Sequence, residues 1–368
     1  MAWGTNYSIM LGIIVLSIFG SAQIAFAGPG NPYTLTNAPG EGTVTIGVDG
    51  FGGFGSFSGL DATDAFYDPI DSILNNPAKT TLASAIAIRS GGSGVWSFLT
   101  SGSGIFGSGG LPNPTVTGTT TFGTSSFSSN GLDFNLVQTL TKTFSGTTLT
   151  QTYTISNPDD PDEIPTPSPI DIDLLRYFDG DLFFDGSIND GGGRLINLAG
   201  IEILFETDAL GTSSTPSTFV GIITDEGTEL TIDRFEINQF PNLGFNLVVV
   251  GNPLGNLVFN DSPPPELDEF IDIALYDVSL ALSSDGFSIG AGESVVYVTK
   301  TVFGDGAPED VEIDPPTEEM VGGIILPIDT MALLIAGAQF NAFFILSILA
   351  LTGSFAFGVL YYKTKRAN

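Results

Sequence analysis

The sequence predicts an all-β protein: an antiparallel β-sandwich ectodomain followed by one C-terminal transmembrane helix. Three observations support this prediction. Apolar residues recur with period two between residues 28 and 303, clusters of Gly, Pro, Asn and Asp separate the alternating runs, and residues 342–362 carry no charge. Because many strands come one after another without long helical patterns between them, an antiparallel sandwich is favoured over a parallel α/β sheet.

Residues 1–27 are predicted to be a secretory signal peptide. Ile9 to Phe19 form an apolar run, and Ala25-Phe26-Ala27 fits the small-residue pattern of a cleavage site before Gly28. No lysine or arginine precedes the apolar run, so an uncleaved N-terminal anchor is the alternative.

The clearest strand prediction is a β-hairpin over Gly131 to Asn157. Leu132, Phe134 and Leu136 alternate with polar residues, and Ser145-Gly146 supplies a short turn before a second alternating run. Asn157 to Pro169 is acidic and rich in proline, which indicates an exposed loop. Further strands are expected at Ile170 to Tyr177, Ile201 to Glu206, Phe219 to Thr224, Leu230 to Ile237, Phe245 to Val250, Ile271 to Leu282 and Ser294 to Val302.

Residues 28–110 are dense in glycine and show weaker strand patterns. Strands are expected at Thr43 to Val48, Ser84 to Arg89 and Val95 to Leu99, and Ala62 to Leu74 suits a short helix. This region is either a subdomain or the first part of the same sandwich, 28–303. Because no linker divides it from the later strands, the second interpretation is favoured.

The C-terminal part predicts a membrane anchor. Residues 304–330 are acidic and contain proline, which indicates a stiff stalk, and residues 331–341 form a short apolar segment suited to the membrane interface. Residues 342–362 would span the bilayer once, since about 20 apolar residues cross the hydrocarbon core. The tail, residues 363–368, holds Lys363, Lys365 and Arg366, which the positive-inside rule places in the cytoplasm.

One resemblance concerns this anchor. The run Val321-Gly322-Gly323, Pro327-Ile328-Asp329-Thr330, Leu333-Leu334 and Ala336-Gly337-Ala338-Gln339 resembles the C-terminal anchor of cell-surface proteins from ammonia-oxidising archaea. The resemblance covers about 45 residues and implies display beneath or within a protein envelope. It implies no catalytic residue and no activity for the ectodomain.

Composition excludes several kinds of chemistry. The chain has no histidine and no cysteine, so Ser-His-Asp catalysis, histidine-ligated metals and thiolate sites are ruled out. Its 41 acidic and 10 basic residues give a formal net charge of −31. Such a charge repels nucleic acid and anionic lipid, so no nucleic-acid partner is expected.

The densest cluster of acids and glycines is a candidate calcium site. Asp179, Asp181, Asp185 and Asp190 lie within twelve residues, and carboxylates in a turn suit Ca²⁺, which takes six to eight oxygen ligands. Their spacing does not match an EF-hand loop, since Phe183 replaces an alternating acid. The alternative is a solvated strand turn, with no metal and no other cofactor.

The segment order predicts a single-pass cell-membrane protein with an extracellular, structural or adhesive ectodomain and no catalytic residue. Its expected partners are the membrane and either envelope proteins or glycans. Two alternatives stay open. One is a carbohydrate-binding module, assisted by Ca²⁺, that stacks sugars on Trp96 or Tyr177. The other is an extracellular hydrolase that uses a pair of carboxylates. Arg176 is expected to pair with a neighbouring acid.

Overall fold

The computed structural model describes residues 25–26, 32–55, 64–70, 77–92, 94–101, 112–143, 145–162, 167–184, 190–196, 202–208, 218–224, 227–258, 270–271 and 276–305. All of them belong to the first of the two units into which the chain divides, Met1–Glu312. The predicted signal peptide apart from its last residues, the stalk beyond Asp305, the interfacial segment, the transmembrane helix and the basic tail lie outside the described residues. Within these described ranges, no helix is long and apolar enough to cross a membrane.

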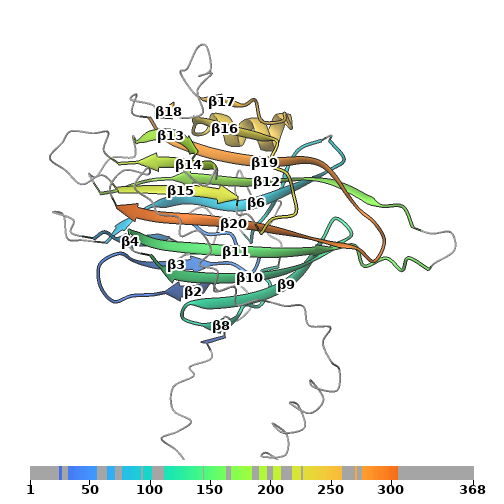
Figure 1. Ribbon diagram of the computed structural model, residues 1–368, viewed down its shortest axis with the longest axis horizontal. Coiled ribbons are helices and arrows are strands. Elements are labelled where there is room, and N and C mark those ends of the chain that lie inside the picture. Colours follow the sequence, from blue (N-terminus) through green and yellow to red (C-terminus); the bar gives the residue numbers. More distant parts are fainter. Residues whose placement is uncertain are drawn as a thin grey trace, which may run out of the picture. The chain divides into compact units, whose positions relative to one another are not determined.

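The largest sheet has ten antiparallel strands in the order β1-β8-β9-β10-β11-β20-β15-β14-β13-β18 (Figure 1). The strands are β1 (Ala25–Phe26), β8 (Thr117–Thr119), β9 (Phe122–Ser129), β10 (Leu132–Lys142), β11 (Gly146–Ser156), β20 (Ser294–Asp305), β15 (Thr218–Thr224), β14 (Glu202–Thr207), β13 (Gly191–Ile196) and β18 (Phe270–Ile271). The last of these strands in the sequence, β20, therefore lies in the interior of the sheet.

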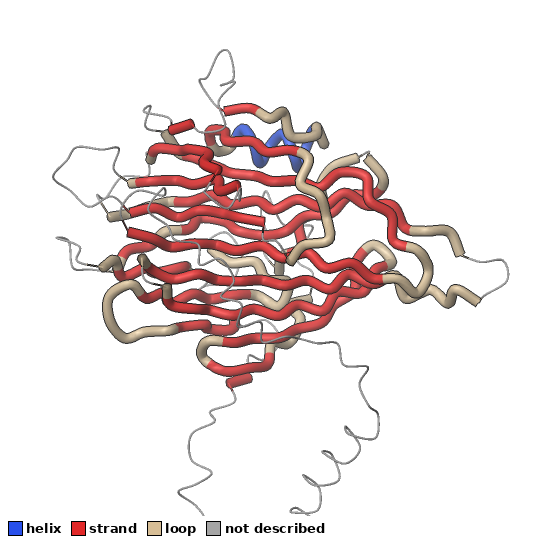
Figure 2. The backbone as a smooth tube through the Cα atoms, viewed as in Figure 1, coloured by secondary structure: helices blue, strands red, loops and turns tan. Residues whose placement is uncertain are grey.

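A second sheet has six strands in the order β17-β16-β19-β12-β6-β7. They are β17 (Leu257–Val258), β16 (Arg234–Gln239), β19 (Val278–Ile289), β12 (Ile170–Gly180), β6 (Thr81–Ser90) and β7 (Ser97–Leu99). A third sheet, of four strands in sequence order, consists of β2 (Tyr33–Thr36), β3 (Thr43–Val48), β4 (Ala65–Asp68) and β5 (Ala78–Lys79). Strands account for nearly all the regular structure, as Figure 2 shows.

The ten-stranded and six-stranded sheets pack face to face through alternating apolar residues. Phe134 and Tyr153 from the larger sheet share one buried cluster with Ile88 and Leu174 from the smaller sheet. A second cluster joins β15 to β12, β19 and the four-stranded sheet. These contacts form the core of a β-sandwich, because period-two alternation sends every second side chain of each strand inward.

The outer face of the six-stranded sheet is covered by a short helical segment. This segment consists of α2 (Asn242–Phe245) and η1 (Asn246–Val250). Leu243 and Leu247 pack on the sheet in a third buried cluster with Leu175 and Tyr177 of β12. Both faces of β12 are therefore buried, and every residue of the strand from Ile172 to Gly180 is buried, the charged Asp173, Arg176 and Asp179 included.

Several strand predictions are confirmed. The hairpin prediction corresponds to β10 and β11, which pair from Asp133 with Ser156 to Lys142 with Thr147. The strand expected at Thr43 to Val48 is β3, and β12, β14, β15 and β20 match their predicted runs within a few residues.

Two predictions of secondary-structure type are wrong. Residues 245–250 form a helical turn instead of a strand, because Leu243 and Leu247, four residues apart, are the positions that pack on the sheet. The expected helix at Ala62 to Leu74 is replaced, in its described part, by strand β4. Ala65 and Tyr67 of β4 are buried and Phe66 is exposed, which is the alternation of a strand.

The glycine-dense N-terminal region contributes strands to the four-stranded sheet and to the six-stranded sheet of the sandwich. Strands β2 to β5 form the four-stranded sheet, whereas β6 pairs with β12 along the sandwich. Tyr33 and Val44 share a buried cluster with Leu149 of β11 and Phe178 of β12. The core of this region is thus continuous with the core of the later strands.

Candidate functional site

The end of strand β12 carries a cluster of carboxyl groups. Asp179 lies on β12 and is fully buried, and Asp181 comes just beyond the strand and is half-buried. Asp190 is also fully buried and forms an isolated bridge with Tyr276, its backbone N donating to Tyr276 O at 2.9 Å. The fourth predicted acid, Asp185, lies outside the described residues.

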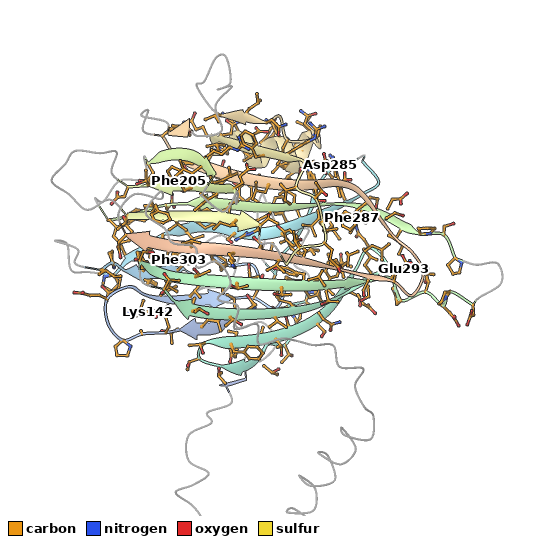
Figure 3. All side chains as sticks on the ribbon, in the orientation of Figure 1. Lys142, Phe205, Asp285, Phe287, Glu293 and Phe303 are labelled. Carbon is orange, nitrogen blue, oxygen red and sulfur yellow. The ribbon has the colours of Figure 1, made fainter. Side chains whose placement is uncertain are left out.

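Two further acids, which the sequence analysis missed, join this cluster. Glu206 is fully buried on β14, directly after Phe205, which is labelled in Figure 3. Asp277 is half-buried and precedes β19 by one residue. Both interact electrostatically with the acids around β12. The cluster therefore draws on β12, β14, the residue before β13 and the residue before β19.

Asp179 lies on the outer face of the six-stranded sheet, and Asp181 and Asp277 act on it electrostatically. Asp179 is two residues from Tyr177, which packs in the outer cluster, and strand alternation places both on the same face. The Tyr177 hydroxyl donates to Asp179 Oδ2 at 3.1 Å. Asp179 also pairs in register with Ser279, two residues after Asp277. We call Asp179, Asp181 and Asp277 the outer acidic triad.

Burial and like charge raise the pKa of each member of the outer acidic triad. Burial raises the pKa of Asp179 well above its usual range, and repulsion from Asp277 and Asp181 adds to the effect. The pKa of Asp181 rises to about 6 because of burial. The pKa of Asp277 also rises to about 6, through burial and then repulsion from Asp181. The triad therefore resists carrying three full negative charges.

The other two acids lie on the inner side of the sandwich. Glu206 and Asp190 contact each other, and burial, followed by repulsion from Asp190, raises the pKa of Glu206 well above its usual range. Two carboxyl groups in contact share a proton more readily than they both ionise. Asp190 Oδ2 also accepts a hydrogen bond from Leu182 N at 3.2 Å, which ties this pair to the chain just after β12.

Gly180 makes room for the inner pair. A Cβ atom at this position would overlap the carboxylate of Glu206. Because Gly180 lies between Asp179 and Asp181, any larger residue there would disturb both sides of the cluster. The glycine in the predicted acid-and-glycine motif is therefore required by close packing, in addition to any turn geometry.

Positive charge does not compensate these acids within the described part of the chain. The raised pKa values of Asp179, Asp181, Asp277 and Glu206 come from burial and neighbouring acids, and no arginine or lysine side chain lowers them. The four ion pairs among the described residues involve other acids: Asp64, Asp173, Glu202 and Asp285. In the same described residues, no group of three or more acids is placed to hold a metal ion.

The structure thus brings together three of the four predicted acids, although on two sides of one strand. Asp179 and Asp181 lie in the outer acidic triad and Asp190 in the inner pair. The burial of Glu206 could have been predicted from the sequence, because it lies two residues after the apolar Leu204 and strand alternation places both side chains on the inner face. The place of Asp277 in the cluster could not have been predicted, because its neighbour in space, Asp179, is far away in the sequence.

The aromatic residues considered for sugar stacking are buried. Trp96 is 2% exposed and Tyr177 is fully buried. The ring of Trp96 is covered by the guanidinium of Arg89, 4.3 Å from the ring centre. Neither ring presents a face to a sugar.

Contrary to expectation, Arg176 forms no ion pair with an acid among the described residues. It is fully buried, and its guanidinium donates to Tyr177 O at 2.6 Å, Ser84 Oγ at 2.7 Å and Thr301 Oγ1 at 3.0 Å. Thr301 belongs to β20 of the larger sheet, so the contact joins the two layers of the sandwich. Arg176 is therefore a structural link within the core.

Comparisons with known proteins add little to this geometry. No family model matches the chain, and no curated protein matches it. A polysaccharide lyase is among the solved structures that are similar, with 9% identity and a TM-score of 0.34 over 77% of this chain and 34% of the lyase. The chain spans about a third of the length of that lyase. A similarity of this size supports no inference about function.

Proposed function

We propose that the chain is a membrane-anchored extracellular protein with a structural or adhesive role, which displays its β-sandwich at the cell surface. The order of the segments supports this proposal: a signal-like N-terminus, an acidic β-sandwich, an acidic stalk, a 21-residue uncharged run and a basic tail. The sandwich would contact envelope proteins or glycans outside the cell.

The position of β20 is the structural observation that carries the proposal. This strand leads directly to the predicted stalk, and it pairs with β11 from Ser294 to Gly304 and with β15 from Thr299 to Asp305 (Figure 1). A pull on the C-terminal end of β20 would act along the strand, at right angles to hydrogen bonds on both edges. These bonds would share the load, which suits a domain held by a C-terminal anchor.

Fractionation and protease treatment of cells that produce the full chain test this proposal. The expected product sediments with membranes, resists extraction by alkaline carbonate, and is cut by protease added to intact cells. Cleavage is expected in the proline-rich loop at residues 157–169, while a cytoplasmic marker protein in the same cells stays intact.

The matched control is a variant that ends at residue 341 and so lacks the uncharged run and the basic tail. We expect this variant in the medium, with the same thermal stability as the full chain. A full chain found in the soluble cytoplasmic fraction, or a truncated variant that stays with membranes, would contradict the proposal.

A further inference from the structure

The outer acidic triad contains oxygen atoms that have no partner in the described part of the chain. Asp179 Oδ1 and Asp277 Oδ1 are both out of contact with water and accept no hydrogen bond there. Asp179 is fixed by its place on β12 and by the Tyr177 hydroxyl on its other oxygen. Burying a carboxylate oxygen without a donor is costly, and a proton or a bound cation at these two atoms would lower that cost.

The charge of the triad leads to the same conclusion. Three carboxyl groups repel one another, and no basic side chain among the described residues offsets them. Compensation must then come from protons or from a cation. A divalent cation offsets two charges at once and supplies a partner to several oxygens, which a proton does not.

We propose that the outer acidic triad, Asp179, Asp181 and Asp277, binds a divalent cation, Ca²⁺ in preference to Mg²⁺, and so fastens the end of β12 to the start of β19. Ca²⁺ fits because it accepts irregular sets of carboxylates, backbone carbonyls and waters, whereas Mg²⁺ demands near-octahedral geometry. The three carboxyl groups are not yet gathered around one point. Asp181 follows β12 and Asp277 precedes β19, both are half-buried, and both act electrostatically on Asp179. Binding of the ion therefore requires their carboxyl groups to move toward Asp179.

The first test is thermal unfolding of the purified full chain in detergent, monitored by circular dichroism at pH 7.5. Saturating Ca²⁺, at about a hundredfold above its dissociation constant, is expected to raise Tm by about 5 °C for a domain of this size. Mg²⁺ is expected to give a smaller shift, and NaCl at matched ionic strength little or none. Equal shifts with NaCl and CaCl₂ would overturn the proposal.

The second test uses two variants of the half-buried acids and one matched control. Asp181→Asn and Asp277→Asn each remove a charge from a half-buried position with little change in side-chain size, and each is expected to weaken Ca²⁺ binding at least tenfold. Asp171→Asn is the control, because Asp171 is an exposed acid on the same strand β12. An undiminished Ca²⁺ response in the double variant Asp181→Asn/Asp277→Asn would overturn the assignment of the site.

Terbium luminescence provides a readout that does not depend on stability or on any variant. Tb³⁺ replaces Ca²⁺ in oxygen sites, and a tyrosine next to the ion sensitises its emission; the Tyr177 hydroxyl lies 3.1 Å from Asp179 Oδ2. The wild-type chain is expected to give saturable emission that excess Ca²⁺ abolishes. Absence of saturable emission, together with a Tm that rises on acidification but not with Ca²⁺, would show that protons alone compensate the triad. This test uses purified protein, so its outcome is independent of the proposed location.

Discussion

Two buried aspartates in this protein, Asp49 and Asp179, differ in the hydrogen-bond donors and charges that surround their carboxyl groups. Both are fully buried. Asp49 Oδ1 accepts hydrogen bonds from Phe51 N at 2.9 Å and Gly53 N at 2.7 Å. Its Oδ2 accepts from Thr100 Oγ1 at 3.0 Å and from the Ser101 backbone N at 2.9 Å. Asp179 accepts one hydrogen bond, from Tyr177, and faces two other acids.

The difference separates a structural carboxylate from a candidate binding site. Hydrogen bonds from backbone N–H groups and hydroxyls oppose the effect of burial on the pKa of Asp49. Asp49 thereby organises the turn that comes after β3 and ties it to residues 100–101. Asp179 organises nothing comparable within the described chain. Burial alone therefore does not identify a candidate binding acid. A candidate is identified by burial together with a lack of hydrogen-bond donors and the presence of neighbouring acids.

Replacing Asp49 by asparagine should have the largest effect on stability. Both oxygens of Asp49 accept backbone N–H groups, so the NH₂ of the new amide would face a donor in either orientation. We expect Asp49→Asn to lower the free energy of unfolding by about 3 kcal/mol. Urea denaturation at pH 7.5 without calcium measures this. A loss below about 1 kcal/mol would remove the contrast between the two aspartates.

The pH dependence of stability should be the next largest effect, and its sign is set by the triad. The pKa of Asp181 and of Asp277 is about 6 in the folded chain, above the ordinary value of 3.8. The folded state therefore binds more protons than the unfolded state. The stabilisation is fully present below pH 3.8 and is lost as the pH rises through about 6.

Without calcium, we expect the free energy of unfolding to fall between pH 5 and pH 8. The loss should be on the order of 1 kcal/mol for each of the two half-exposed groups, after allowance for screening by water. Denaturation curves over this pH range measure the effect, and the double variant Asp181→Asn/Asp277→Asn should reduce it. A wild-type protein that is more stable at pH 8 than at pH 5 would contradict the described electrostatics.

Replacing Asp179 by asparagine should have the smallest effect. The change removes a charge that faces two acids, and the oxygen of the new amide can still accept from Tyr177. We expect Asp179→Asn to leave the stability at pH 7.5 without calcium within about 1 kcal/mol of the wild-type value. The same denaturation experiment as for Asp49→Asn gives the comparison. A loss as large as that of Asp49→Asn would mean that Asp179 is structural too.

Much of the fold is encoded in local patterns of the sequence. The hairpin of β10 and β11 was predictable because Leu132, Phe134 and Leu136 alternate with polar residues on a half-buried sheet. The helical turn at α2 and η1 was not, since a short apolar run such as Leu247 to Val250 fits a strand or a helix until its packing partner is known.

The candidate site was predictable only in part. Asp179 and Asp181 were found because they lie close together in the sequence with glycine between them. Asp277 directly precedes β19, which pairs with β12 only after folding, and a pairing over such a separation leaves no local signal. The division of the acids between two faces of β12 also depends on which face each sheet covers, and this is a property of the packed sandwich.

Calorimetric titration of CaCl₂ into the purified full chain at about pH 6, in two buffers with different ionisation enthalpies, tests the central claim most directly. If the cation binds at the outer acidic triad, it must displace protons from Asp181 and Asp277, whose pKa is about 6. The account predicts a saturable heat of binding that differs between the two buffers. No saturable heat, or an identical heat in both buffers, would contradict it.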